Sequence, residues 1–191
     1  AIDGALVKAG LVHVQFETIH PFLDGNGRVG RLLIALLLHH DGVLRQPLLY
    51  LSLYFKQNRA EYYRLLDAVR ATGDWEAWLD FFLIGVRDTA TTAVEAAHRL
   101  LALFEEDADV IRNLGRAAGN ILRVFAVLQR RPVATIDYLA DASGVSYATA
   151  VRAVRTLTEI GLLRELTGRR RGRVFAYDRY LVILSEGAQP L

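Results

Sequence analysis

The sequence predicts a mainly α-helical protein in two parts, a helical bundle followed by a small α+β module with the outline of a winged helix-turn-helix. Apolar residues recur at helical spacing through the first hundred residues, whereas short β-like runs occur only near the end. Charge also changes along the chain, because residues 1–111 contain 10 Lys/Arg and 15 Asp/Glu, whereas residues 112–191 contain 13 and 6. The second part is therefore expected to bind an anionic partner.

The helices expected in the first part are separated by Pro, Gly and Asp, which interrupt helical periodicity. Their ranges are 6–18, 28–40, 52–69, 75–104 and, leading into the second part, 114–128. The second of these is apolar on nearly every side, which predicts a central place in the core. The acidic stretch 105–109 is either a domain boundary or a solvated helix turn. We take the first domain as residues 1–109.

The second domain is expected at residues 112–185, followed by a loose tail at 186–191. Its pattern contains two short helices, then two β-like runs, at residues 136–142, 146–160, 162–166 and 174–177. Ser146 is placed to cap the second of these helices. This order of elements is typical of a winged helix-turn-helix.

The segment from His20 to Arg31 carries residue types suited to phosphate chemistry. Gly25 and Gly27 allow backbone N–H groups to turn toward one anion, and the start of the following helix adds its positive dipole end. Arg28 and Arg31 lie three residues apart on one face of that helix, where they can neutralise phosphate oxygens. Such a loop is predicted to hold a polyphosphate.

Two further side chains in this segment suit transfer chemistry. Asp24 can hold a Mg²⁺ ion that bridges phosphates, since Mg²⁺ takes one or two carboxylates together with substrate oxygens. His20 can accept a proton from an attacking hydroxyl near neutral pH. Each residue type alone is more often structural, but their combination within twelve residues favours a functional site.

The segment His20-Pro21-Phe22-Leu23-Asp24-Gly25-Asn26-Gly27-Arg28-Val29-Gly30-Arg31 resembles the signature of the Fic family, His-x-Phe-x-Asp/Glu-Gly-Asn-Gly-Arg-x-x-Arg, at every defined position. The similarity extends over about residues 1–104, including the helix that carries Tyr62 and Tyr63. It implies a Fic-type helical bundle and a protein adenylyltransferase, which transfers AMP from ATP to a Ser, Thr or Tyr hydroxyl of a target protein and releases pyrophosphate. It also implies that the flap and nucleotide pocket that precede the signature in the family are missing from the nineteen residues before His20.

The resemblance assigns a role to each matching residue. His20 would be the catalytic base, and Asp24 would bind Mg²⁺ between the α- and β-phosphates. The residues that would bind the phosphates of ATP are Gly25, Asn26, Gly27, Arg28 and Arg31. Phe22 would point inward and anchor the loop. Tyr62 and Tyr63 would enclose the adenine, although core packing is expected for at least one of them, because adjacent helical residues face different ways.

Two positions separate adenylyl transfer from other reactions of the family. Phosphorylating members of the Doc type have Lys where this chain has Gly27, and phosphocholine-transferring members usually have Ala where it has Gly25. The resemblance therefore favours transfer of AMP.

The second domain carries two clusters of arginine that suit a phosphate backbone. Arg152 and Arg155 lie three apart on the expected recognition helix, and the wing turn contains Arg169, Arg170, Arg171 and Arg173. These residues predict DNA binding, but a basic winged helix also suits homodimerisation or docking of the target protein. An alternative function is therefore a nucleotide-sensing, DNA-binding transcriptional regulator.

Composition excludes some classes of site and favours a cytoplasmic protein. The absence of Cys excludes disulfides, thiol catalysis and Cys-ligated zinc. The longest apolar run, residues 32–38, is far shorter than the ~20 residues of a membrane-spanning helix, so no membrane partner is expected. No secretory signal is recognisable at the start of the sequence.

Overall fold

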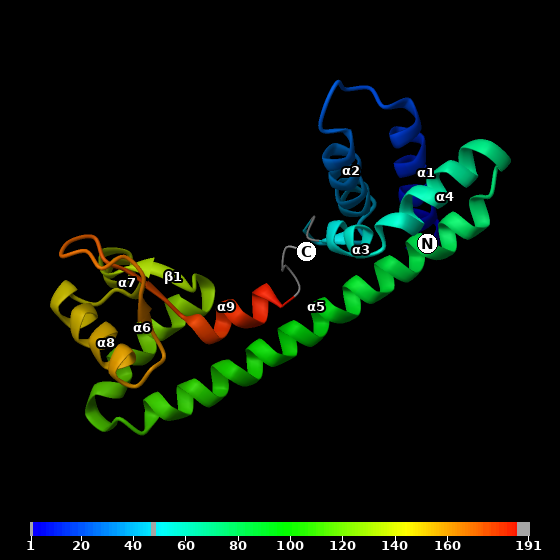
Figure 1. Ribbon diagram of the computed structural model, residues 1–191. Coiled ribbons are helices and arrows are strands. Elements are labelled where there is room, and N and C mark those ends of the chain that lie inside the picture. The colour runs from blue at the N-terminus through cyan, green and yellow to red at the C-terminus, as the bar shows by residue number, and fades with distance from the viewer. Residues whose placement is uncertain (1, 47–48, 187–191) are drawn as a thin grey trace. The chain divides into compact units, whose positions relative to one another are not determined.

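The computed structural model describes residues 2–46 and 49–186, which form a mainly helical protein with one small sheet, as the sequence predicts (Figure 1). Its contacts define two compact units, one ending at Val94 and the other beginning at Glu95. The domain limits expected from the sequence, near residues 109 and 112, stay predictions. The expected tail lies almost entirely outside the described residues.

The first unit is all helical. Its elements are α1 (Ile2–Ile19), α2 (Asn26–His40), α3 (Leu51–Gln57), α4 (Arg59–Thr72) and the first part of α5 (Trp75–Arg112). Their fully buried faces meet in one core around Val14, Ile34, Leu65, Trp78 and Phe82. The central place expected for the apolar helix is confirmed, because Ile34 and Leu38 of α2 are each only 1% exposed.

The single helix expected at residues 52–69 is wrong, because the chain breaks at Asn58 between α3 and α4. The side-chain amide of Asn58 donates a hydrogen bond of 2.9 Å to the carbonyl of Tyr54. Asparagine competes in this way with regular helical hydrogen bonding, so a polar residue inside an apolar pattern ends one helix and begins the next. Ser52 therefore lies on α3, a separate helix of seven residues.

The second unit contains the expected winged helix-turn-helix. After the remainder of α5 and a short 3₁₀ turn, Gly115–Ala117, its elements are α6 (Ala118–Arg130), β1 (Val133–Thr135), α7 (Ile136–Ser143), α8 (Tyr147–Glu159), β2 (Arg164–Glu165), β3 (Val174–Ala176) and α9 (Asp178–Ser185). The strands form an antiparallel sheet in the order β1-β3-β2. Ser146 caps α8 as predicted, since its hydroxyl accepts a hydrogen bond of 3.2 Å from the Thr149 backbone. Strand β1 and helix α9 were not expected from the sequence.

The acidic stretch 105–109 neither interrupts a helix nor lies wholly in solvent. Helix α5 continues through it, and Asp107 is completely buried. The Asp107 carboxylate accepts hydrogen bonds from the Tyr177 hydroxyl and from the Arg179 guanidinium, both in the winged unit. The end of α5 is therefore part of the core of the second unit.

Candidate active site

The signature segment forms the loop between α1 and α2 and the first turns of α2. The backbone N–H of His20 donates to the carbonyl of Phe16 at 2.9 Å, so the helical turn extends to His20. His20 then has a φ of 49°, a left-handed value that no other described residue except glycine adopts. Non-glycine residues in this region carry backbone strain, which is found preferentially at functional sites. The side chain of His20 is exposed.

Asn26 closes the loop by binding its backbone. Its side-chain amide donates to the carbonyl of Phe22 at 2.5 Å, and its side-chain oxygen accepts from the Phe22 N–H at 2.9 Å. Asn26 is 2% exposed, whereas the ring of Phe22 is 51% exposed. The expectation that Phe22 points inward as the anchor is therefore wrong. The anchor is the Asn26 amide, which satisfies two backbone groups that an aromatic ring cannot pair.

Each of the two loop glycines leaves room for one arginine. A Cβ at Gly25, whose φ is +83°, would lie 3.4 Å from the Nη2 atom of Arg28, and a Cβ at Gly27 would lie 3.1 Å from the Nη1 atom of Arg31. Both guanidinium groups therefore fold over the backbone at the start of α2, where helical N–H groups lack intrahelical partners. Positive charge and free donors meet there, as an anion site requires.

The Asp24 carboxylate and the Arg28 guanidinium form a loose pair. Their closest atoms are 3.4 Å apart, and the side chains are 94% and 77% exposed. An exposed pair of this kind contributes little free energy and is readily exchanged for other partners. Among the described residues, no three His, Asp or Glu side chains are arranged to hold a metal ion. A Mg²⁺ ion at Asp24 fits if its other ligands are phosphates and water, as is usual for this ion.

Arg31 has a partner that the sequence did not reveal. Its Nε atom donates a hydrogen bond of 3.1 Å to the hydroxyl of Ser52 in the first turn of α3. This contact leaves the other guanidinium nitrogens available for an anion. A hydroxyl at the expected start of a helix was the available signal. Its pairing with Arg31, which lies far from it in the sequence, depends on tertiary packing.

The two adjacent tyrosines of α4 lie in different environments. Tyr62 is 4% exposed and packs among aromatic rings, 4.9 Å between ring centres from Phe55, whereas Tyr63 is 52% exposed. The prediction that at least one of them is a core residue is confirmed for Tyr62, and burial raises its pKa. A contact of Tyr63 or Tyr62 with adenine stays a prediction, and only Tyr63 has an exposed ring to offer.

A buried polar cluster lies beneath the loop, between α1 and α2. His13 is completely buried, and its Nε2 atom lies 2.9 Å from the Tyr62 hydroxyl. Glu17 is 9% exposed, and within the described residues its Oε1 atom has no hydrogen-bond partner, nor has the Nδ1 atom of His13. Burial lowers the pKa of His13 to about 4. Burial also raises the pKa of Glu17, while the charges of His20, Arg31 and Arg70 oppose this shift.

Sequence reasoning assigned no chemistry to His13 and did not single out Glu17. One signal was available, namely Gly30 inside the apolar helix, because an isolated helical glycine often marks a close approach. A Cβ at Gly30 would lie 2.6 Å from Glu17 Oε1 and 3.3 Å from His13 Cε1. Gly30 therefore permits α1 and α2 to approach closely around the polar cluster.

The arginines of the winged unit lie where the sequence placed them, on α8 and on the connection between β2 and β3. All six are exposed: Arg152, Arg155, Arg169, Arg170, Arg171 and Arg173. Arg155 pairs with Glu159 at 2.7 Å, and Arg152 lies 3.3 Å from the Thr149 hydroxyl. Arg170, Arg171 and Arg173 line a hollow of about 230 Å³ together with Tyr147 at the start of α8.

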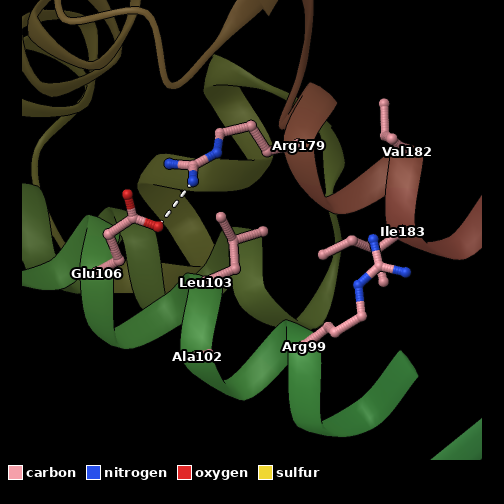
Figure 2. Close-up of a pocket in the computed structure, with 7 residues that line it drawn as sticks. All are labelled: Arg99, Ala102, Leu103, Glu106, Arg179, Val182 and Ile183. Carbon is pink, nitrogen blue, oxygen red and sulfur yellow. Dashed lines mark hydrogen bonds and ion pairs between the residues drawn. The ribbon is translucent and has the colours of Figure 1, made fainter. Parts of the chain in front are cut away.

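A larger hollow of about 420 Å³ lies between α5 and α9 of the second unit (Figure 2). Its floor is apolar and includes Leu103. The arginines at its rim are already paired, Arg99 with Glu186 and Arg179 with Glu106 and Asp107. This hollow therefore offers no unpaired charge for a ligand.

Two family models match the chain in the regions just described. Residues 2–38, which include the whole signature loop, match the Fic/DOC family, and residues 117–167 match the IclR helix-turn-helix domain. The signature loop and the helices that flank it are therefore similar to the Fic/DOC family, and the winged unit is similar to the helix-turn-helix domain of the IclR type.

Several curated proteins resemble parts of the chain. A probable protein adenylyltransferase of Aquifex aeolicus is 54% identical over 37 residues, which cover 19% of the chain and 12% of that protein. Protein adenylyltransferase fic-1 of Caenorhabditis elegans is 32% identical over 108 residues, or 56% of the chain and 18% of that protein. The chain thus spans about an eighth to a fifth of the length of the curated relatives it matches.

A crystal structure of a Fic family protein from Desulfovibrio desulfuricans G20 is 25% identical, with a TM-score of 0.46 over 91% of this chain and 49% of that one. Within residues 2–46 and 49–186, no helix is both long and apolar enough to cross a membrane.

Proposed function

We propose that this protein is a protein adenylyltransferase that uses ATP and Mg²⁺ to attach AMP to a Ser, Thr or Tyr hydroxyl of a target protein. The observation that carries the proposal is the pair of glycines that fold Arg28 and Arg31 over the start of α2. The names of the curated relatives, which are protein adenylyltransferases, support the same activity.

In the proposed reaction, His20 removes the proton of the target hydroxyl as its oxygen forms a bond to the α-phosphorus of ATP. The bond between the α-phosphorus and the oxygen that bridges to the β-phosphorus breaks, and pyrophosphate leaves with the electron pair. Arg28, Arg31 and the N–H groups at the start of α2 stabilise the charge that moves onto the departing phosphates. The exposed position of His20 leaves it accessible to a hydroxyl on a second protein.

Asp24 is the residue that would hold Mg²⁺, and the bound ion would neutralise phosphate charge during transfer. Binding there requires Asp24 to leave its exposed contact with Arg28, which costs little. The same exchange releases Arg28 for the phosphates. Without substrate, Asp24 and Arg28 therefore pair with each other, and on binding Asp24 would exchange Arg28 for Mg²⁺ and Arg28 would exchange Asp24 for phosphate.

The test is transfer of label from α-labelled and, separately, γ-labelled ATP, in the natural protein that contains this chain and in its His20→Ala variant. We expect target proteins to take label from the α form only, and we expect a loss of about 10²- to 10⁴-fold in the variant because the base is removed. Label from the γ form would show phosphorylation instead. Transfer that persists in the variant would remove His20 from its role.

DNA binding through the winged unit is a second candidate function, and the hollow shared by the wing and α8 favours it. Wing arginines and the start of α8 line one surface, which could follow a phosphate backbone beside a groove, although Asp137 also lines it. If these arginines neutralise phosphates, the affinity for duplex DNA will fall steeply with salt, and replacing Arg170 and Arg171 by Ala will reduce the salt slope by about two. Binding that is weak at low salt and independent of these residues would instead favour protein docking or dimerisation.

A further inference from the structure

We propose that Glu17 is a positioning residue for His20, where its carboxylate stabilises the positive charge that the ring gains when it accepts the proton of the target hydroxyl. This inference rests on the proposed function, because it concerns the base of that reaction. It assigns a role to a residue three positions before His20 at the end of α1.

Glu17 is buried at a free-energy cost that packing does not explain. The side chain is 9% exposed, and within the described part of the chain its Oε1 atom has no hydrogen-bond partner. An unpaired buried carboxylate oxygen is unfavourable and is usually retained for a functional reason. Gly30 is the device that makes room for it, since any side chain at that position would collide with the carboxylate.

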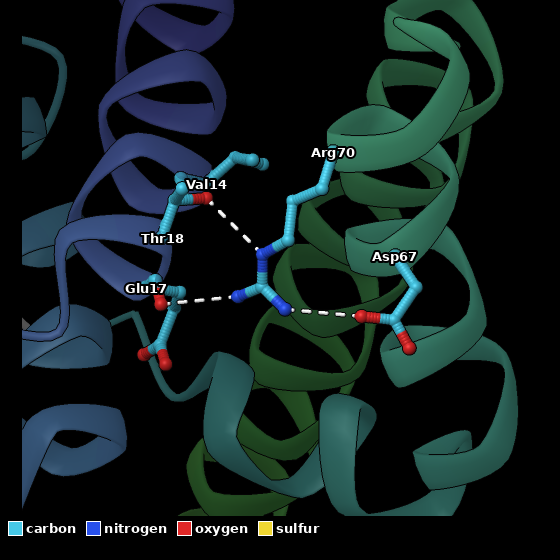
Figure 3. Close-up of polar contacts among 5 residues, drawn as sticks. All are labelled: Val14, Glu17, Thr18, Asp67 and Arg70. Carbon is cyan, nitrogen blue, oxygen red and sulfur yellow. Dashed lines mark hydrogen bonds and ion pairs between the residues drawn. The ribbon is translucent and has the colours of Figure 1, made fainter.

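The basic residues near Glu17 are His20, Arg31 and Arg70. Arg70 is engaged elsewhere: it pairs with Asp67 at 3.0 Å and donates to the Glu17 carbonyl at 3.0 Å and to the Thr18 hydroxyl at 3.3 Å (Figure 3). No dashed line in Figure 3 reaches the Glu17 carboxylate. Arg31 donates to Ser52 through Nε, and its Nη1 atom lies over Gly27 at the start of α2, where the phosphates are proposed to bind.

His20 is the one of these three basic residues whose side chain makes no hydrogen bond or ion pair to another described residue. A carboxylate without a partner and a histidine without a partner lie one helical turn apart. When His20 takes the proton, its ring becomes positive, and a fixed negative charge nearby stabilises that state more than the neutral one. Glu17 thus acts mainly on the transition state and little on the binding of ATP.

The test compares Glu17→Gln and Glu17→Asp with the wild-type natural protein in the α-label assay, together with thermal unfolding. Glu61→Gln is the matched control, since Glu61 is an exposed residue of the same unit that pairs only with Arg64. We expect Glu17→Gln to lower kcat about 10- to 100-fold with little change in the KM for ATP, because the lost interaction forms only during the reaction. Glu17→Asp should restore part of kcat, since it keeps the charge.

The unfolding data separate this role from a structural one. Removing an unpaired buried charge should leave the unfolding temperature of Glu17→Gln equal to or above that of the wild type. A lower unfolding temperature with kcat/KM unchanged for the folded fraction would overturn the proposal in favour of a packing role. Equal kcat in the wild type and Glu17→Gln would also overturn it, while leaving adenylyl transfer established. Absence of α-label transfer in the wild type would overturn the proposed function and this assignment together.

Discussion

Among the described residues, each unit buries one acidic side chain, but the two differ in their hydrogen bonding. Asp107 in the winged unit is completely buried, and both its oxygens accept hydrogen bonds, from Tyr177 and from Arg179. Glu17 in the first unit is almost as buried, but its Oε1 atom is left without a partner among the described residues. In the winged unit, this carboxylate holds α5 against α9 and against Tyr177, the residue that precedes α9.

The difference shows how burial can serve two purposes. A buried carboxylate whose two oxygens both accept hydrogen bonds fixes a structure, because removing it leaves buried donors unpaired. A buried carboxylate left partly unpaired stores an unfavourable interaction that a reaction can relieve. The strained backbone of His20 lies beside the second kind of carboxylate and not the first. Removing the carboxylate of Asp107 should therefore lower stability, whereas removing the carboxylate of Glu17 should lower turnover.

The largest effect on stability is expected for Asp107→Ala. The substitution leaves the buried hydroxyl of Tyr177 without an acceptor, and we expect it to reduce the free energy of unfolding by about 3 to 4 kcal/mol. Urea unfolding followed by far-UV circular dichroism measures this change. The matched control is Asp109→Ala, two residues along the same helix, whose exposed pair with Arg112 contributes little. Equal losses in the two variants would show that burial of Asp107 is not what matters.

Acid should destabilise the first unit through His13. Burial lowers the pKa of His13 to about 4, below the usual value near 6.5, so the unfolded chain binds the proton more tightly. The stability contributed by neutral His13 is complete above pH 6.5 and is lost as the pH falls toward 4, by about 3 kcal/mol. Tryptophan fluorescence can follow this loss, since both Trp residues, Trp75 and Trp78, lie in the first unit.

The control for this prediction is a comparison of variants at each pH. His13→Gln removes the titrating group and should flatten the dependence between pH 6.5 and 4, whereas His40→Gln, at an exposed site, should not. Burial raises the pKa of Glu17, so its ionisation lowers stability as pH rises and adds a slope common to both variants. Parallel curves for His13→Gln and wild type would contradict the assignment.

The spacing of apolar residues, the positions of Pro and Gly, and the signature segment predicted most of the helices, the winged helix-turn-helix and the position of the candidate loop. They failed where a single polar side chain decided the outcome. Asn58 divides a helix that apolar spacing made continuous, and Asn26 replaces Phe22 as the anchor of the loop. Glu17 could not be found, because its importance depends on which cations lie near it and which of them are already paired. Such facts arise from tertiary packing, which spacing along the chain does not encode.

The smallest effect is expected for Gly30→Ala, which tests the space around the buried carboxylate of Glu17. A Cβ at Gly30 would lie 2.6 Å from Glu17 Oε1 and 3.1 Å from the Phe16 ring, so we expect a loss of about 1 to 2 kcal/mol, although alanine is the better helix former. Gly4→Ala in α1 is the control, because its Cβ would meet no atom within 4 Å and should be neutral or stabilising.

A double-mutant cycle with Glu17→Ala then isolates the contact between Glu17 and Gly30. If the loss in Gly30→Ala arises from the collision with the carboxylate, shortening Glu17 should remove most of it, giving a favourable coupling of about 1 kcal/mol in urea unfolding. Additive losses would instead place the collision at Phe16 or His13, and Gly30 would then serve the packing of α1 against α2 without making room for the carboxylate. A favourable coupling would show that glycine is required at position 30 mainly because it leaves room for the Glu17 carboxylate between α1 and α2.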